Sequence, residues 1–207
     1  MKTLAILGAS GHGKVIADAA RLTGVWSDIV FYDDAWPHKS KNGSAAVVGN
    51  TDSLLNSTER KSTDVIIAIG NNTVRYKKLE QFMAIGFSIA TVVHPKAIVS
   101  SNAVIDIGTV VLAGAVINSD ASIGKAVIIN SNAVVEHDCK ISDGVHVSPG
   151  SCLAGGVMVG AGSWIGIGST VRQLIKIAEN VVVGAGAVVI SDIPKNTNVV
   201  GVPAKPI

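Results

Sequence analysis

The chain has 207 residues, enough for one or two domains, and carries a formal net charge of +2 at pH 7. No run of basic residues accompanies this charge, which argues against nucleic acid as the main partner. Hydrophobic residues make up 48% of the chain, but the charge-free stretch at 144–171 is rich in glycine and includes Pro149, so we expect no membrane insertion.

The first ninety or so residues have the pattern of a small α/β domain. The first apolar segment runs directly into a glycine loop instead of a cleavage site, so no secretory signal is expected. Parallel strands would gather their loops at the carboxyl ends, where such sheets bind ligands. The pattern predicts strands at 4–7, 29–32, 46–48 and 64–69 and helices at 15–22 and 73–85.

The loop after the first strand contains three glycines and has several interpretations. Gly8, Gly13 and Lys14 match the start of the phosphate-binding loop of NTPases, but Val15 stands where that motif needs a hydroxyl group for magnesium. A kinase or NTPase is therefore disfavoured. A structural alternative is that the glycines only permit a tight turn, although His12 in the middle of the loop is hard to explain as a core residue.

Two acidic residues follow the second expected strand. Asp33 and Asp34 stand where the ribose-binding acids of dinucleotide folds usually lie, although the glycine fingerprint before them is imperfect. A further interpretation is that loop amides at the helix N-terminus bind a nucleotide diphosphate or a sugar. The pattern predicts a nucleotide-type ligand and leaves a dehydrogenase-like NAD site as an alternative.

From residue 93 the pattern changes to a repeat of six. Every sixth residue from Val93 to Val189 is aliphatic, and a small or aliphatic residue stands four positions after each of them. This period fits neither a helix nor simple strand alternation, so the chain must turn a corner every six residues. Three units would close a triangular coil of about 18 residues, and stacked coils form a parallel β-helix. An ordinary valine-rich sandwich is disfavoured.

The repeat places His137 at a bend, two residues after an inward position, so its imidazole should point out of the prism. Such a histidine can titrate near neutral pH, and Asp138 could fix its tautomer and stabilise the imidazolium. Gly155 lies one coil further on, where it would leave space for a thioester and expose an N–H to an oxyanion. A surface histidine with incidental acidic neighbours is the structural alternative.

A second histidine lies half a coil further along. His146 follows His137 by nine residues, so the two face different sides of one chain. They can share a site only across a subunit interface, and the alternative is a packed histidine on a β-helix face. Pro149, Ile167 and Ala185 stack along another edge at the coil spacing.

Neither a disulfide scaffold nor a metal site is expected. Cys139 falls on an inward position and Cys152 has no obvious partner, so we expect two free thiols that do not act as nucleophiles. The histidines lack the usual spacing of metal ligands. There are five of them: His12, His38, His94, His137 and His146.

Short motifs spread over nearly the whole chain are specific in combination: GASGHG at 8–13, DD at 33–34, AIGNN at 68–72 with Arg75, EHD at 136–138 and GVPAK at 201–205. Together they resemble one subgroup of the hexapeptide-repeat acyltransferases. This subgroup contains the sugar acetyltransferases that N-acetylate nucleotide-linked 4-amino-6-deoxysugars, as in bacillosamine synthesis, and the related sialic acid O-acetyltransferases. The segment from 32 to 50 matches least well. The resemblance implies a left-handed β-helix, a homotrimer and acetyl-CoA held between subunits.

The resemblance also implies site residues. The nucleotide-sugar would bind Ser10, Gly11, His12, Asp33, Asp34 and Gly70. Acetyl-CoA would contact His146, Gly155, Ile167 and Ala185. His137 and Asp138 would be the catalytic pair.

We therefore expect a small Rossmann-like α/β domain at 1–92 that binds a nucleotide-sugar. A left-handed parallel β-helix at 93–195 would hold acetyl-CoA and the catalytic residues, and a C-terminal tail would follow at 196–207. The expected reaction is metal-free, direct N-acetylation of the 4-amino group of a nucleotide-linked 4-amino-4,6-dideoxysugar, with UDP favoured and His137 as general base. O-acetylation of a sugar or sialic acid, or a non-catalytic nucleotide-binding β-helix, are the alternatives. A cytoplasmic homotrimer is expected.

Overall fold

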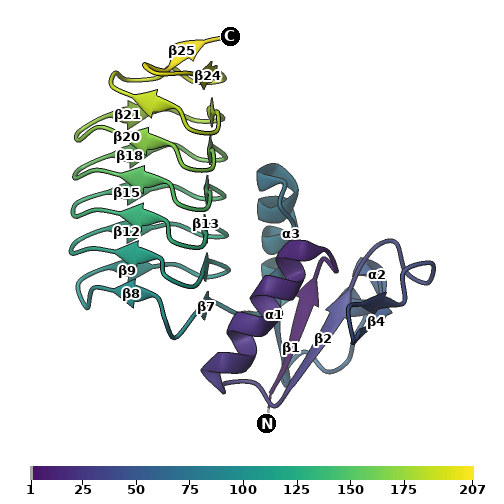
Figure 1. Cartoon of the computed structure of the whole chain (residues 1–207). Coiled ribbons are helices and arrows are strands. Elements are labelled where there is room, and N and C mark those ends of the chain that lie inside the picture. The colour runs from purple at the N-terminus through teal and green to yellow at the C-terminus, as the bar shows by residue number, and fades with distance from the viewer. Residues whose placement is uncertain (1) are drawn as a thin grey trace. The chain divides into compact units, whose positions relative to one another are not determined.

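The computed structural model describes residues 2–207, which form two compact units that meet in sequence between Pro95 and Lys96. Met1, the first residue of the predicted front domain, lies outside the described residues. No helix in residues 2–207 is long and apolar enough to span a bilayer. Figure 1 shows the sheet and helices of the first unit and the stacked coils of the second.

The first unit is built on a parallel sheet in the order β4-β2-β1-β5-β6, to which the short strand β3 adds an antiparallel edge beside β4. The order reverses at β1, which places a ligand crevice outside the carboxyl ends of the central strands. The strands of this sheet are β1 (Thr3–Leu7), β2 (Asp28–Tyr32), β3 (Lys41–Asn42), β4 (Ala45–Gly49), β5 (Thr63–Ile67) and β6 (Ser88–Ile89). The strand β7 (Val92–Val93) follows β6 in the chain and belongs to a different sheet.

Three helices complete the first unit: α1 (Gly11–Thr23), α2 (Thr51–Leu55) and α3 (Asn72–Ala84). The predicted start of the first helix at residue 15 is wrong, because α1 already begins inside the glycine loop with Ser10 as its N-cap. Glycine has low helix propensity, which hid this first turn in the sequence. The short elements β3 and α2 were not predicted.

The second unit is a parallel β-helix in which two-residue strands alternate with corners. Each strand from Ile98 to Val171 pairs in parallel with the strand 18 residues later, as Val116 with Val134 and Val134 with Cys152, so the predicted coil length is confirmed. In the last coil the spacing shortens, because Val182 pairs with Asn198. Three sheets run along the stack, and we call them faces I, II and III.

Face I contains β10 (Val110–Val111), β13 (Ile128–Ile129), β16 (His146–Val147), β19 (Trp164–Ile165), β22 (Val182–Val183) and β24 (Asn198–Val200). Face II contains β8 (Ile98–Val99), β11 (Val116–Ile117), β14 (Val134–Val135), β17 (Cys152–Leu153), β20 (Thr170–Val171) and β23 (Val188–Val189). Face III contains β9 (Val104–Ile105), β12 (Ser122–Ile123), β15 (Lys140–Ile141), β18 (Met158–Val159) and β21 (Lys176–Ile177).

The second residue of each of these two-residue strands points into the prism and forms the core. All of them from Val111 to Val189 are buried, whereas Val99 and Ile105 in the first coil are only half-buried. A coil buries its inward side chains against the coils on both sides, so an end coil is covered less completely. At the other end, β24 pairs with the antiparallel strand β25 (Lys205–Pro206), as Figure 1 shows.

The outward residues give each face a different surface. On face II they are apolar or small: Ile98, Val116, Val134, Cys152, Thr170 and Val188. On face III they include two cations: Val104, Ser122, Lys140, Met158 and Lys176. On face I two aromatic rings stand among aliphatic residues: Val110, Ile128, His146, Trp164 and Val182. Val110 and Ile128 are buried, whereas Trp164 and Val182 are exposed.

Candidate functional site

In the first unit, the loops that follow β1, β2 and β5 leave the sheet at the same edge. Gly8 has a φ of 115°, and a Cβ there would lie 2.6 Å from the carbonyl oxygen of Ala68. A Cβ on Gly13 would collide with the carbonyl of Gly8. Both glycines are therefore needed for close packing. At Gly11 and Gly70, by contrast, a Cβ would meet nothing within 4 Å, so the chain itself leaves this space open.

Ser10 and His12 stand at the N-terminus of α1. The Ser10 side chain is exposed and makes no capping hydrogen bond. Burial, and to a lesser degree the charge of Arg75, lowers the pKa of His12 to about 4, so its imidazole is neutral at physiological pH. Its Nε2 atom is buried and has no hydrogen-bond partner among residues 2–207.

Asp33 holds the glycine loop in place. Its carboxylate accepts hydrogen bonds from the N–H of Ala9 at 2.8 Å and of Ala35 at 3.0 Å, and Lys39 Nζ lies 3.4 Å away. Burial alone would raise the pKa of Asp33, but these hydrogen bonds outweigh burial and lower it. Asp33, which was predicted to contact the substrate, therefore also positions the glycine loop after β1, which was predicted to contact it too.

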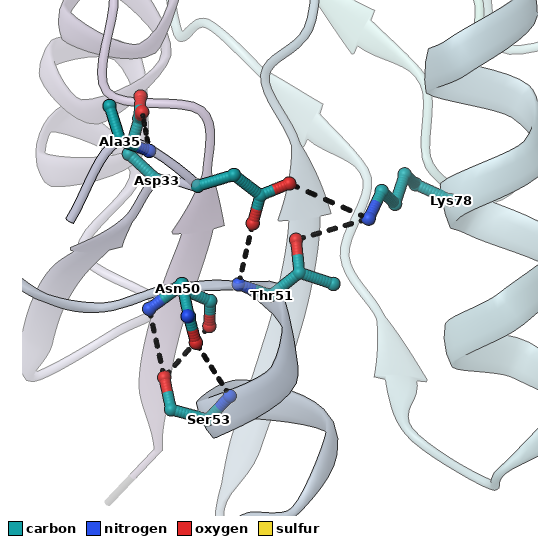
Figure 2. A network of polar contacts seen from close by, with 7 residues as sticks. Asp33, Ala35, Asn50, Thr51, Ser53 and Lys78 are labelled. Atoms are coloured by element: carbon teal, nitrogen blue, oxygen red, sulfur yellow. Dashed lines mark hydrogen bonds and ion pairs between the residues drawn. The ribbon is translucent and has the colours of Figure 1, made fainter.

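Asp34 belongs to a polar network that joins three segments of the first unit. It accepts a hydrogen bond from the N–H of Thr51 at 2.8 Å, while Lys78 Nζ of α3 lies 3.1 Å from Thr51 Oγ1 and 3.7 Å from the Asp34 carboxylate. Burial would raise the pKa of Asp34, but the bonds from Thr51 and the charge of Lys78 lower it. Figure 2 shows Lys78 directed at Thr51, with the Asn50–Ser53 capping box of α2 alongside.

Arg75 holds the turn after β5 through hydrogen bonds to its main-chain carbonyls. It is fully buried, and its guanidinium donates to the carbonyls of Ile69 and Gly70 and to Asn72 Oδ1 at 2.9–3.1 Å. Burial lowers the pKa of Arg75 to about 10, so it remains charged at neutral pH. The sequence placed Arg75 in a motif without giving it a role, because its contacts are with main-chain carbonyls that no pattern reveals.

In the β-helix, His137 lies at the corner between faces II and III. Its Nδ1 atom is 2.8 Å from Asp138 Oδ2, and 63% of its side chain is exposed. The hydrogen bond to Asp138 raises the pKa of His137 above its ordinary value, with the nearby carboxylate charges adding to it. With Nδ1 bonded to Asp138, Nε2 is the nitrogen directed to solvent and able to accept a proton.

Gly155 lies directly beside this imidazole, as its spacing predicted. A Cβ on Gly155 would come within 2.6 Å of His137 Cε1 and 2.7 Å of Nε2, so only glycine leaves the ring its position. Gly155 has no φ in the left-handed region, which makes the imidazole, and not backbone strain, the reason for this glycine.

The other predicted acetyl-CoA residues line a separate groove on face I and its neighbouring corner. His146, Ile167 and Ala185 lie there with Trp164, in an apolar groove of about 430 Å³. His146 stacks on Trp164 with ring centroids 5.2 Å apart, and Trp164 Nε1 donates to Ser148 Oγ at 2.7 Å. Trp164 was not predicted, although its outward position in the six-residue frame marks it as a surface aromatic.

The second unit thus contains two partial arrangements. His137, Asp138 and Gly155 share one corner, whereas His146, Ile167 and Ala185 share the groove. The half-coil separation of the two histidines keeps them on different sides of the prism, as predicted.

The two thiols are free, as predicted. Cys139 is fully buried, and burial raises the pKa of its thiol, which argues against a thiolate nucleophile. Cys152 is exposed on face II. Residues 2–207 contain no cluster of three or more side chains suited to hold a metal ion.

Comparison with known proteins places these features in context. Residues 3–82 match the PglD N-terminal domain family. The acetyltransferase domain of PglB from Neisseria gonorrhoeae FA1090 is 40% identical over 100% of both chains, with a TM-score of 0.97. The same domain in complex with acetyl coenzyme A is 41% identical over 100% of this chain and 99% of that one, with a TM-score of 0.96.

A mutant of perosamine N-acetyltransferase from Caulobacter crescentus, in complex with CoA and GDP-perosamine, is 36% identical over 100% of this chain and 97% of that chain, with a TM-score of 0.94. The curated UDP-N-acetylbacillosamine N-acetyltransferase of Bacillus subtilis (strain 168) is 41% identical over 108 residues, which span 51% of this chain and 49% of that relative. The predicted fold class, a small Rossmann-like α/β domain followed by a left-handed parallel β-helix, is confirmed.

Proposed function

Because the chain belongs to the hexapeptide-repeat sugar acetyltransferases represented by the PglB and perosamine enzymes, we propose that it transfers the acetyl group of acetyl-CoA to an amino-sugar. The acceptor is the 4-amino group of a nucleotide-linked 4-amino-4,6-dideoxysugar, with UDP favoured as the nucleotide. His137 is the general base. Acetyl-CoA is a cytoplasmic metabolite, so we place the reaction in the cytoplasm.

The single observation that carries the proposal is the corner formed by His137, Asp138 and Gly155. The Asp138 carboxylate accepts the hydrogen bond from Nδ1 of His137, which leaves Nε2 as the basic atom. Gly155, which lies beside the imidazole, leaves room for a reacting carbonyl. The amide N–H of Gly155 makes no hydrogen bond to another residue in the described part of the chain and can donate to an oxyanion. A positioned base and a free N–H are what acyl transfer to an amine requires.

The chemistry follows from these groups. The sugar nitrogen attacks the thioester carbonyl while Nε2 of His137 takes a proton from this nitrogen, and Asp138 stabilises the imidazolium that forms. The tetrahedral oxyanion collapses, the C–S bond breaks and the imidazolium returns the proton to the departing sulfur. No covalent enzyme intermediate is needed.

The first unit supplies the nucleotide-sugar site. Ser10, Gly11 and His12 present a helix N-terminus with an unused hydroxyl and a neutral imidazole, which suits a diphosphate and its sugar. The open space at Gly70 and the acidic pair after β2 complete the site. The Bacillus relative carries UDP in its name, which supports UDP, whereas the Caulobacter structure contains GDP-perosamine.

We further propose that the active unit is a homotrimer. The outward side chains of face II are apolar or small, with Ile98 66% exposed, which suits burial against another copy. The groove with His146 and the corner with His137 lie on different sides of one prism, so acetyl-CoA can contact both only between copies.

The proposal is tested by measuring CoA release with acetyl-CoA and four acceptors: UDP-, dTDP- and GDP-linked 4-amino-6-deoxysugars and free sialic acid. We expect fastest transfer to the UDP-sugar, and a loss of about 10²–10⁴-fold in kcat for His137→Asn with unchanged binding of the nucleotide-sugar. Transfer to sialic acid alone would assign O-acetylation instead. Binding of nucleotide-sugar without turnover by the natural enzyme would leave only the non-catalytic alternative.

A further inference from the structure

Leu174 lies at the same corner of the β-helix as His137 and Gly155, and the proposed chemistry does not use it. The strands on both sides of this corner pair at a spacing of 18 residues, so positions 120, 138, 156 and 174 stack along it. The residues at these positions are Asp120, Asp138, Gly156 and Leu174. Their φ angles are 61°, 60°, 70° and 62°, so all four have the left-handed backbone conformation.

Leucine is out of place in this conformation. Glycine adopts it freely, and asparagine and aspartate are the side chains that tolerate it best. The other non-glycine residues with positive φ in residues 2–207 are aspartate, asparagine or alanine: Asp120, Ala126, Asn132, Asp138, Asn180 and Asn196. Leu174 therefore strains the backbone at a position where glycine would not.

Burial of the side chain does not offset this strain. Leu174 is 74% exposed, so most of its apolar surface remains in water and contributes little to folding. Its main-chain N–H donates to the carbonyl of Gly155 at 3.0 Å, a bond that does not depend on the side chain. Backbone strain that folding does not explain is typical of a functional position.

The leucine side chain borders the space beside the base. Its Cδ2 atom reaches back over Gly156, where an added Cβ would lie 2.8 Å from it. From the other direction the His137 ring reaches over Gly155, where an added Cβ would lie 2.6 Å from Cε1. His137 and Leu174 are about two coils apart, roughly 10 Å at about 4.8 Å per coil, and both side chains extend into this interval. The interval between imidazole and leucine is therefore narrow.

The reacting thioester belongs in this interval, because its carbonyl oxygen would accept the hydrogen bond from the N–H of Gly155. The sugar nitrogen must approach from the side of the imidazole, since Nε2 of His137 takes its proton. The acyl group then lies towards Leu174, whose apolar side chain suits a methyl group and leaves little length beyond it.

We propose that Leu174 is a specificity-determining residue that restricts the transferred acyl group to acetyl. This inference rests on the proposed function and adds the means by which the site rejects longer acyl-CoA donors. The strained leucine is then retained for donor selection and not for stability.

The test compares acetyl-CoA, propionyl-CoA and butyryl-CoA as donors to the nucleotide-sugar that the natural enzyme uses best. The natural enzyme should prefer acetyl to propionyl about 10-fold or more in kcat/KM, and Leu174→Gly should reduce this preference to about 3-fold or less. Leu174→Met, which retains most of the side-chain volume, should keep the preference. Asn180→Gly, at an exposed left-handed position on another corner, is the control and should also keep it.

A stability measurement distinguishes donor selection from a merely structural role. Glycine adopts the φ of Leu174 without strain, so Leu174→Gly should keep or raise the Tm. A fall in Tm of more than about 4 °C would instead assign the leucine to packing on Gly156 and overturn the inference. Equal use of acetyl-CoA and propionyl-CoA by the natural enzyme, or an unchanged preference in Leu174→Gly, would also overturn it.

Failure of the proposed function is recognised separately. If the natural enzyme acetylates no nucleotide-sugar, that function is wrong, and the dissociation constants of acetyl-CoA and propionyl-CoA, measured by calorimetry, still test Leu174. Tighter binding of acetyl-CoA that Leu174→Gly abolishes would support donor selection. Equal constants in the natural enzyme, or a difference that persists in Leu174→Gly, would overturn it.

Discussion

The two units of the chain prepare their functional groups in opposite ways. In the first unit, Asp33, Asp34 and Arg75 are each held by two or more contacts to neighbouring segments. In the β-helix, His137 is exposed and its ring bonds only to Asp138 among the contacts described. The difference contrasts a pre-organised site, whose groups are held by several contacts, with a half-built site, whose base is held by one contact and is open to solvent.

The largest expected effect comes from filling the space beside the half-built site. Gly155→Ala should reduce kcat about 100-fold or more, because the new Cβ would lie within 2.7 Å of the imidazole and displace it. The affinity for nucleotide-sugar, measured by calorimetry, should not change. A variant with normal kcat would show that the imidazole does not need its present position.

The pre-organised site should affect how the free energy of unfolding depends on pH. The folded-state pKa of His12 is about 4, below the ordinary histidine value of 6.5, so the folded chain binds fewer protons than the unfolded chain between these pH values. The stability that depends on a neutral His12 is fully present above about pH 6.5 and is lost as the pH falls towards 4. The cost of protonation approaches about 3 kcal/mol.

His12→Gln should remove this part of the pH dependence, whereas His38→Gln, at an exposed histidine, should retain it. Denaturation followed by the fluorescence of Trp26 and Trp36 in a Trp164→Phe background reports the first unit alone. Equal slopes of stability against pH in both variants would contradict a buried neutral imidazole.

The corresponding test in the β-helix is a change in the pH–rate profile. Asp138 raises the pKa of His137, and the base must be neutral, so the acid limb of kcat/KM lies above the ordinary value for histidine. Asp138→Asn should shift this limb to lower pH and reduce kcat about 10-fold, since the tautomer is no longer fixed. An unmoved limb would assign the titration to another group.

The smallest expected effect concerns the network of Figure 2. Lys78→Met removes the link between α3 and the Asp34–Thr51 pair and should weaken nucleotide-sugar binding about 3- to 5-fold. Lys77→Met, at the exposed neighbouring position, is the control and should leave binding unchanged. Equal dissociation constants for the two variants would remove Lys78 from the site.

The same contrast explains how far the sequence could predict each unit. The β-helix was predictable almost residue by residue, because a strict period of six fixes which side chains point inward and which residues stack one coil apart. Its lysines and Trp164 followed from the same frame, since the residue before each inward position points outward, but they were not assigned a role. The half-burial of Val99 and Ile105 depends on the end of the stack, which the period does not reveal.

The first unit was less predictable because its order depends on contacts between loops. The strands and the acidic pair were recognisable, whereas the bond from Ala9 to Asp33 joins residues 24 positions apart and has no sequence signature. The capping box at Asn50 and Ser53 was a usable signal for α2 that was not recognised. The predicted start of α1 was wrong because glycine and histidine have low helix propensity, so the first turn did not look helical in the sequence.

The antiparallel pairing of β24 with β25 gives the coil stack a defined end. A parallel β-helix otherwise presents its last strands as an open template on which another prism could continue. At β24 this template is occupied by a strand of opposite direction, and Pro206, opposite Val199, has no N–H to donate. The reversal of one short strand thus closes the end of face I to pairing with a further parallel strand, while the sides of the prism are left uncovered by it.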